Sequence, residues 1–296
     1  MKASFFHYAL SEGLSRVIPI GGAYAIGRWV ADLVWGLSPR ERRAVEENLR
    51  LVLGPQTPDD AEIRRKAREV YSNFSRYCVD LLYYGRLHPS GEGKNLWENL
   101  ERVNPEALDR ALRAGRGALV VSAHLGNWEL GAMALAHRYP VSIIAKRHSD
   151  ERVDSVFMKR RRFHGVLVIP AGFAFRPSLR ALGENRIVAL NADREFSKKG
   201  GIPVDFLGIP ARLPRGPAAI SRASGTPVVG CFMVPADGPT RYRMFFEGPL
   251  FPNGDSEEAF SARIGRMLED AIRKWPTQWF VFENFKAIAG SNGDRP

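Results

Sequence analysis

Five short apolar runs, rich in Val, Ile and Leu, constrain the possible folds of this chain more than any other feature. Stretches with helical periodicity separate most of them. A parallel sheet needs such near-continuous apolar strands, because helices cover both of its faces. The sequence therefore predicts an α/β fold with a mostly parallel sheet flanked by helices. The five runs are GALVVSAH (117–124), VSIIAK (141–146), VLVIPA (166–171), RIVALNAD (186–193) and PVVGCFMV (227–234).

The segment before these runs, residues 38–115, is predicted to be helical. Its first helix should begin with Ser38 as cap, Pro39 in the first turn and Glu41 as the third helical residue. Further helices should begin at 57–60, continuing to residue 87, and at 104–106. Two later runs, YRMFFEGPL and QWFVFENF, are expected to add strands at an edge of the sheet.

The N-terminal part has a different character. Residues 17–37 are mostly apolar, but Arg28 and Asp32 interrupt them. A helix that spans a bilayer needs about 20 apolar residues with few charges. The sequence is therefore interpreted as an amphipathic helix over residues 11–37 that lies in a bilayer interface, with an ordinary helical hairpin of the core as the alternative. Its expected anchors are Tyr24, Trp29 and Trp35.

This interpretation divides the chain into a membrane-associated segment, residues 1–37, and one domain, residues 38–296.

Lys and Arg number 43 against 32 Asp and Glu, a net charge of +11. Such an excess favours anionic phospholipid, an acidic carrier protein or nucleic acid as partner. Nucleic acid is disfavoured, because the aromatic residues lie in apolar runs rather than among Arg and Lys, and no known binding module occurs.

The candidate chemistry lies where the first apolar run ends. In open α/β sheets the reactive groups gather beyond the carboxyl ends of the strands. The run GALVVSAH ends in His124, and Glu129 follows five residues later. Residues five apart do not face each other on a continuous helix or strand, so the chain must turn between them. Gly126 and Asn127 suit such a turn, which predicts a strand, a tight turn and a helix that begins near Glu129.

A carboxylate beside an imidazole fixes its tautomer and stabilises its protonated form. His124, oriented by Glu129, would then be a general base for an attacking hydroxyl, while a purely structural role is the alternative. The G-x-S-x-G pattern of a serine nucleophile is absent, which favours direct transfer over a covalent intermediate. No metal site is expected, because H-E-x-x-H and paired His–Cys spacings are absent.

The block from His124 to Glu129 resembles the H-x4-D/E motif of glycerolipid acyltransferases. Its setting, AHLGNWEL, is similar in particular to the bacterial late acyltransferases of lipid A biosynthesis and to their relatives that acylate phosphatidylinositol mannosides. Four more blocks occur in that family's order and extend the resemblance over nearly the whole chain. They are AVEENLRLVLG, Arg161 four residues before Gly165, Asn191-Ala192-Asp193 leading into VDFLGIPARLPRGPAAISRASGTPVV, and WPTQWFVFENFK.

The resemblance implies a fold like that of glycerol-3-phosphate acyltransferase, with N-terminal membrane-associated helices. It implies an enzyme that moves a fatty acyl chain from acyl carrier protein or coenzyme A to a hydroxyl of a membrane glycolipid, in lipid A and lipopolysaccharide biosynthesis. No cofactor is implied beyond the thioester co-substrate. The implied location is the cytoplasmic face of the inner membrane, peripheral or monotopic, with anionic membrane lipids as partners.

The resemblance also favours three residues as substrate contacts. Arg161 would bind phosphate or stabilise an oxyanion, against the ordinary interpretation of a basic run as a solvated helix face. Asp193, at the end of a strand, would pair with Arg161 opposite His124, or would only cap the next turn. Arg215 opens a predicted helix and is the third candidate.

One departure from the family pattern bears on the acceptor. The family commonly ends with His-Arg-Arg before Phe-Lys, where this chain has Glu283 and Asn284. Two cationic positions are therefore missing. If those positions normally meet the phosphates of lipid A, the acceptor here is another lipid, such as a mannolipid or a lysophospholipid.

Overall fold

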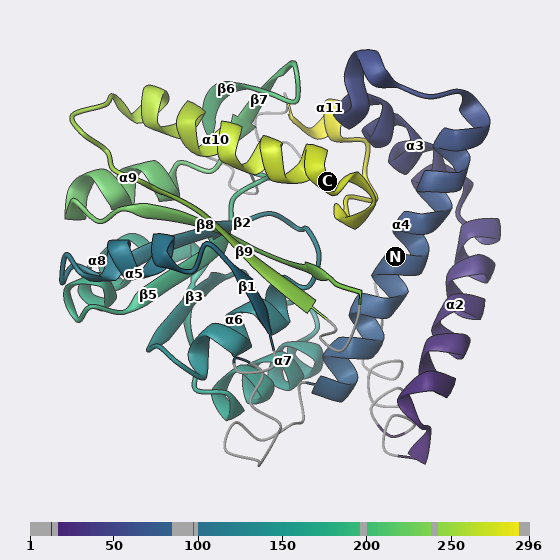
Figure 1. The fold of residues 1–296 in the computed structure, drawn as a ribbon, viewed down its shortest axis with the longest axis horizontal. Coiled ribbons are helices and arrows are strands. Elements are labelled where there is room, and N and C mark those ends of the chain that lie inside the picture. The colour runs from purple at the N-terminus through teal and green to yellow at the C-terminus, as the bar shows by residue number, and fades with distance from the viewer. Residues whose placement is uncertain are drawn as a thin grey trace.

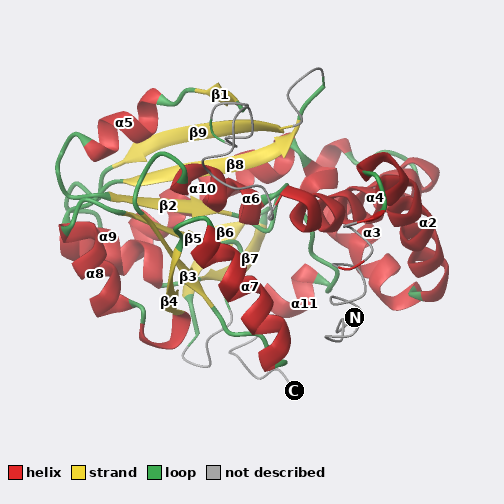
Figure 2. Ribbon diagram, turned by 90° about the horizontal axis from the view of Figure 1, so that it is seen from below, coloured by secondary structure: helices red, strands yellow, loops and turns green. Residues whose placement is uncertain are grey.

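The computed structural model describes residues 13, 17–84, 97, 100–195, 200–237 and 242–289 (Figure 1). These residues form a seven-stranded sheet and a separate two-stranded hairpin beside helix α10 (Glu257–Lys274). Figure 2 shows three N-terminal helices grouped at one end of the sheet. They are α2 (Ile20–Leu37), α3 (Pro39–Leu53) and α4 (Asp60–Tyr84).

The sheet has the strand order β1-β9-β8-β2-β5-β3-β4. Strands β8, β2, β5, β3 and β4 are parallel to one another, whereas β9 is antiparallel to β8 and parallel to β1. All five apolar runs form the parallel strands, so the predicted α/β class is confirmed. The strands are β1 (Glu101–Val103), β2 (Ala118–Ser122), β3 (Val141–Ala145), β4 (Leu167–Pro170), β5 (Ile187–Asn191), β8 (Val228–Pro235) and β9 (Tyr242–Leu250).

Alternate residues of the central strands face two separate apolar cores. On β2, Ala118 and Val120 lie in one core, and Leu119 and Val121 lie in the other. The first core is covered by α5 (Glu106–Leu112), α6 (Trp128–Ala136) and α7 (Glu151–Phe163). The second is covered by α8 (Phe175–Gly183), α9 (Gly216–Ser224) and α10. This two-sided burial explains why the strands read as continuous apolar runs.

Two late segments differ from their expected form. YRMFFEGPL forms β9, which is an interior strand because β1 pairs with its outer side. QWFVFENF is not a strand. A 3-10 turn (Pro276–Gln278) ends on its first residue, Trp279 makes an isolated bridge to Leu125, and helix α11 (Phe285–Ala289) begins at its last residue. A hairpin, β6 (Ile202–Phe206) and β7 (Ile209–Leu213), occupies a region for which no strands were predicted.

The predicted helix starts are largely confirmed. Helix α3 begins at Pro39, but the Ser38 side chain makes no capping hydrogen bond, because Ser38 serves as the tight junction between α2 and α3. Asp59 caps α4 by accepting a hydrogen bond from the Glu62 backbone N–H at 2.8 Å. The expected continuation of α4 from residue 85 to 87 lies outside the described residues.

Helix α2 has one face on the protein and one exposed apolar face. Within the described part of the chain, no helix is both long and apolar enough to cross a membrane. Of the three expected anchors, only Trp29 is exposed; Trp35 packs edge-on against Tyr71 at 5.3 Å between ring centroids, and Tyr24 bonds to α4. That part of the prediction is wrong because α4 covers their side of the helix. The division of the chain at residue 37 stays a prediction.

The turn between β2 and α6 has the expected form. Gly126 has φ +61°, and Asn127 caps α6 by accepting a hydrogen bond from the Leu130 backbone N–H. A Cβ on residue 126 would lie 2.0 Å from the Met233 carbonyl oxygen of β8. Only glycine therefore allows both this backbone conformation and this approach to the neighbouring strand.

Replacing Gly126 by Ala should cost more than the roughly 1–3 kcal/mol of left-handed strain, because the new methyl group also meets a backbone carbonyl. Urea denaturation measures the loss. Gly115→Ala is the matched control, since Gly115 has φ +68° and open space around its position. Equal losses in the two variants would show that the close approach to Met233 is unimportant.

Candidate active site

His124 is positioned by the pairing of two parallel strands. In the register of β2 and β5, Ser122 lies level with Asn191. The pairing continues past the strand ends, because the Ala192 backbone N–H donates to the Ser122 carbonyl at 2.8 Å. Two residues beyond that register, His124 and Asp193 come side by side. Their Nδ1 and Oδ1 atoms are 2.7 Å apart.

The Asp193 carboxylate is completely buried, and each of its two oxygens takes part in a hydrogen bond. Its second oxygen accepts a hydrogen bond from the Trp279 indole N–H at 2.9 Å. Burial by itself would raise the pKa of Asp193, but the charge and hydrogen bond of His124, together with Arg194 and Trp279, hold it well below its usual range. Asp193 is therefore an ionised acceptor for the N–H at Nδ1, and Nε2 is the ring nitrogen on the side of the imidazole away from the carboxylate.

The His124 side chain keeps 20% of its surface exposed, whereas its partner carboxylate has none. The Trp128 ring stands edge-on to the imidazole at 5.2 Å between centroids. A partly exposed imidazole on a buried carboxylate is the arrangement that general-base chemistry needs, because the base stays accessible while its orientation is fixed.

The expected partnership of His124 with Glu129 is wrong. Both oxygens of Glu129 accept hydrogen bonds from Arg161, at 2.5 Å from Nη2 and 3.2 Å from Nε. The expected pair of Arg161 with Asp193 is wrong for the same reason. The first turn of α6 directs Glu129 toward the last turn of α7, while strand register brings Asp193 to His124. Sequence spacing does not specify which strand or helix lies next to a residue.

The pair of Glu129 and Arg161 is almost fully buried, at 9% and 7% side-chain exposure. Burial opposes the charge on the Arg161 guanidinium, but the Glu129 carboxylate outweighs it and raises the pKa of Arg161. Arg160 is buried as well, and only Arg162 of the three consecutive arginines is exposed. The basic run is therefore mainly interior, and its ordinary interpretation as a solvated helix face does not hold.

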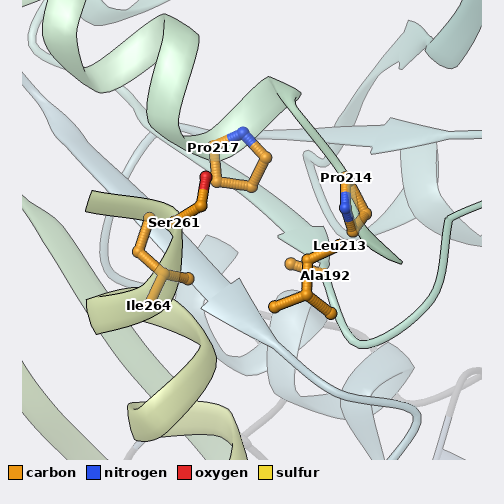
Figure 3. A pocket seen from close by; sticks show the side chains of 6 residues that line it. All are labelled: Ala192, Leu213, Pro214, Pro217, Ser261 and Ile264. Atoms are coloured by element: carbon orange, nitrogen blue, oxygen red, sulfur yellow. The ribbon is translucent and has the colours of Figure 1, made fainter. Parts of the chain in front are cut away.

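Arg215 is placed apart from these two pairs. It precedes α9, is exposed, and its Nε donates to Glu257 of α10 at 2.6 Å. The prolines on either side of it, Pro214 and Pro217, line a small apolar hollow beside Ala192, with Leu213, Ser261 and Ile264 (Figure 3). This hollow has room for about one water molecule, so it is not an acyl-chain site.

Trp279 is the residue that sequence reasoning missed. The backbone N–H of Phe280 donates to the His124 carbonyl at 2.7 Å, and that of Gly126 donates to the Gln278 carbonyl at 2.9 Å. The segment WPTQWF therefore lies along the turn after β2, with the Trp279 indole directed at Asp193. The only signal for it in the sequence was the likeness of this block to the family pattern.

The two positions that depart from the family pattern make contacts within the chain. Glu283 accepts a hydrogen bond from Arg194, the neighbour of Asp193, at 3.4 Å. Asn284 caps α11 by accepting from the Ala287 backbone N–H and also bonds to Glu47. A carboxylate thus stands beside Arg194. Among the residues that the structure describes, no group of three His, Cys, Asp or Glu side chains is arranged to hold a metal ion.

Comparisons with known proteins bear on this site. Residues 4–286 match the model of a family described as bacterial lipid A biosynthesis acyltransferase. The phosphatidylinositol mannoside acyltransferase of Mycobacterium tuberculosis is 30% identical over 70% of this chain and 68% of that protein. The corresponding protein of Mycolicibacterium smegmatis is 28% identical over 91% and 94%. The lipid A biosynthesis palmitoleoyltransferase of Escherichia coli K12 is 23% identical over 64% and 62%.

Among solved structures, the chain is similar to the 1-acyl-sn-glycerophosphate acyltransferase PlsC from Thermotoga maritima. The sequence identity is 14% and the TM-score 0.38, over 87% of this chain and 97% of that chain. The matched residues include both pairs of side chains, Trp279 and the two departing positions, and the match confirms the resemblance inferred from the sequence. This protein belongs to the bacterial lipid A biosynthesis acyltransferase family and is an acyltransferase.

Proposed function

We propose that this protein transfers a fatty acyl chain from a thioester of acyl carrier protein or coenzyme A to a hydroxyl of a membrane glycolipid, with His124 as general base and Asp193 as its orienting carboxylate. The observation that carries this proposal is the 2.7 Å contact between His124 and a buried, indole-bonded aspartate. This arrangement replaces Glu129 by Asp193 in the orienting role.

The reaction needs no covalent enzyme intermediate. Nε2 of His124 takes the proton of the acceptor hydroxyl as its oxygen attacks the thioester carbonyl. Asp193 stays ionised and stabilises the imidazolium that forms. When the tetrahedral intermediate collapses, the C–S bond breaks and the thiolate takes the proton back from Nε2. An ester and a free thiol result, and the imidazole returns to its neutral form.

Glu129 and Arg161 are assigned a positioning role. The Arg161 side chain is only 7% exposed and its Nε and Nη2 bond the two Glu129 oxygens, so its charge is assigned to Glu129 rather than to a substrate phosphate. The pair instead ties the first turn of α6, which follows the turn after His124, to the end of α7. Arg215 stays a candidate contact for substrate, on the rim beside the hollow at Ala192.

Two acceptors follow from the names of the relatives. Lipid A is the acceptor expected from the family description, in lipopolysaccharide biosynthesis. A mannolipid is the second candidate, and the carboxylate of Glu283 beside Arg194 favours it, because it lowers the positive charge available for lipid A phosphates. Incubating the protein with each acceptor and each thioester donor, followed by mass spectrometry of the lipid products, separates the alternatives.

The proposed location of the protein is the cytoplasmic surface of the inner membrane, which it would contact through α2. Its exposed apolar residues, Ile26, Trp29, Val30, Leu33 and Leu37, recur at helical spacing on one side of the helix. The net charge of +11 attracts the protein to anionic lipid. No cofactor is proposed beyond the thioester co-substrate.

Replacing His124 by Ala should abolish transfer, and Asp193→Asn should slow it by about 10²–10⁴-fold, by analogy with loss of the group that orients a catalytic histidine. Initial rates with a labelled thioester measure both. His148→Ala is the control, because His148 is exposed and its ring stacks on Phe157 rather than on a carboxylate of the site. An Asp193→Asn rate within a few-fold of wild type would remove Asp193 from the mechanism.

Replacing either Glu129 or Arg161 by Ala should destabilise the fold by about 3–5 kcal/mol, because each change leaves a buried charge without its partner. The double variant should lose much less than the sum of the two single losses. Thermal unfolding measures the loss, with Glu62→Ala in an exposed ion pair as the control for an ordinary surface change. If Arg161→Ala raised KM without lowering stability, a substrate-binding role would replace the positioning role.

The double change Trp29→Glu and Leu33→Glu should weaken binding to vesicles, because it places charges on the exposed apolar face of α2. Binding of the unchanged protein should increase with anionic lipid and decrease with salt, since screening acts over roughly 8–10 Å at physiological ionic strength. Sedimentation with vesicles measures both effects. Phe251→Glu, which places one such charge at an exposed aromatic residue outside α2, should have no effect. Unchanged binding of the α2 variant would exclude this surface.

A further inference from the structure

A second buried carboxylate lies in the N-terminal helical layer, on α4. Asp80 is completely buried and accepts two phenolic hydrogen bonds. Tyr24 of α2 donates to one oxygen, and Tyr242, the first residue of β9, donates to the other. Arg76, one turn earlier on α4, has its Nε 3.7 Å from the carboxylate. Asp80 therefore joins three elements that are far apart in the sequence.

The hydrogen bonds continue from Tyr242 into the turn of the active site. Asn127 donates to the Tyr242 hydroxyl through Nδ2 at 3.1 Å. The other end of its amide caps α6 by accepting from the Leu130 backbone N–H at 3.3 Å. Its own backbone N–H donates to the Met233 carbonyl at 2.7 Å. Asn127 thus fixes the turn between His124 and α6 from two directions.

The protonation state of Tyr242 determines the direction of the two hydrogen bonds that its hydroxyl makes. Burial first, and then the Asp80 charge, raise the pKa of Tyr242 well above its usual value, so the phenol keeps its proton and donates it to Asp80. Its oxygen is then the acceptor for Asn127. The guanidinium of Arg76 lies over the rings of both tyrosines, 6.0 Å from Tyr24 and 5.9 Å from Tyr242. The buried charge is therefore compensated, as a carboxylate in this position requires.

The same chain of contacts begins on the helix with the exposed apolar face. Tyr24 points to Asp80 from the protein side of α2, while Trp29 and Leu33 are exposed on its other side. Any displacement of α2 from α4 breaks the Tyr24 bond and leaves one oxygen of a buried carboxylate without that donor. Such a loss is unfavourable in a low-dielectric interior. One series of hydrogen bonds consequently connects the packing of α2 on α4 with the turn after His124.

We propose that Asp80 is a positioning residue of the acyl-transfer centre, which holds the His124 turn through Tyr242 and Asn127 and makes that hold depend, through Tyr24, on helix α2 being seated on α4. The proposal rests on the proposed function of His124. It assigns to the membrane-facing helix a second role, in turnover, beyond attachment. A bilayer that binds the exposed face of α2 favours the seated helix and thereby the productive position of the imidazole.

The test removes one hydroxyl at a time. Tyr24→Phe and Tyr242→Phe should each lower kcat on anionic vesicles by about tenfold to a hundredfold, with KM for the thioester nearly unchanged, because small displacements of a reacting group have effects of this size. The double variant should be scarcely slower than the slower single variant, since both hydroxyls act through the same carboxylate. Asp80→Asn should show the same split between kcat and KM.

Tyr83→Phe is the matched control. The Tyr83 hydroxyl also connects α4 to the segment just before α2, by donating a hydrogen bond to the Ile18 carbonyl at 2.5 Å. This contact does not involve Asp80. This variant should lose thermal stability comparable to that of Tyr24→Phe and keep its kcat. If all three phenylalanine variants lose stability equally and keep kcat, or if the Tyr24 and Tyr242 losses in kcat add, the relay is only structural and the proposal fails.

A measurement independent of activity separates this proposal from the proposed function. In protein labelled with ¹⁵N-histidine, the His124 ring signals are assigned by their loss in His124→Ala. They should shift in Tyr24→Phe and Tyr242→Phe and stay in place in Tyr83→Phe. If the wild-type protein acylates none of the acceptors, the proposed function fails, while the ring signals still decide whether the relay reaches His124. Unshifted signals in all variants would overturn the relay.

Discussion

The pairing of β2 with β5 is the contact on which the site depends. Their register brings the residues two positions beyond each strand end together, and so it places the His124 imidazole on the Asp193 carboxylate. Two neighbouring features support that contact. Trp279 bonds the far oxygen of the carboxylate, and the glycine at position 126 lets the chain turn away under the carbonyl of β8. A shift of one residue in register would separate the imidazole from the carboxylate.

The pair of His124 with Asp193 and the pair of Glu129 with Arg161 have different characters. Asp193 holds an imidazole that stays partly exposed, whereas Glu129 and Arg161 are both buried. Both oxygens of Glu129 accept hydrogen bonds from Arg161. In the first pair the imidazole is 20% exposed. The second pair is an ion pair between two helices in which both side chains are less than 10% exposed. Accessibility, rather than residue type, therefore separates the proposed catalytic pair from the positioning pair.

The three N-terminal helices, α2, α3 and α4, cover the end of the sheet where His124 lies and connect it to the surface. Tyr77 of α4 stacks on Trp128 at 4.6 Å between centroids, directly beside the imidazole. Asp80 lies one turn further along the same helix face and reaches the other side of the catalytic turn through Tyr242. Helix α2 lies on the side of α4 that faces away from the sheet (Figure 2). Its exposed apolar residues include Trp29 and Leu33. The proposed lipid surface and the proposed base are thus separated by a single packed helix.

The amino-acid sequence by itself determined the α/β class, the five parallel strands, the turn at Gly126 and the family, because strand burial, backbone conformation and motif order are local properties of the chain. It also brought His124, Glu129, Arg161 and Asp193 into the candidate site. Only the tertiary structure decided which of them are partners, the role of Trp279, and which side of α2 faces α4. Those are choices between neighbours distant in the sequence, and they follow from strand register and helix packing, which no spacing along the chain encodes.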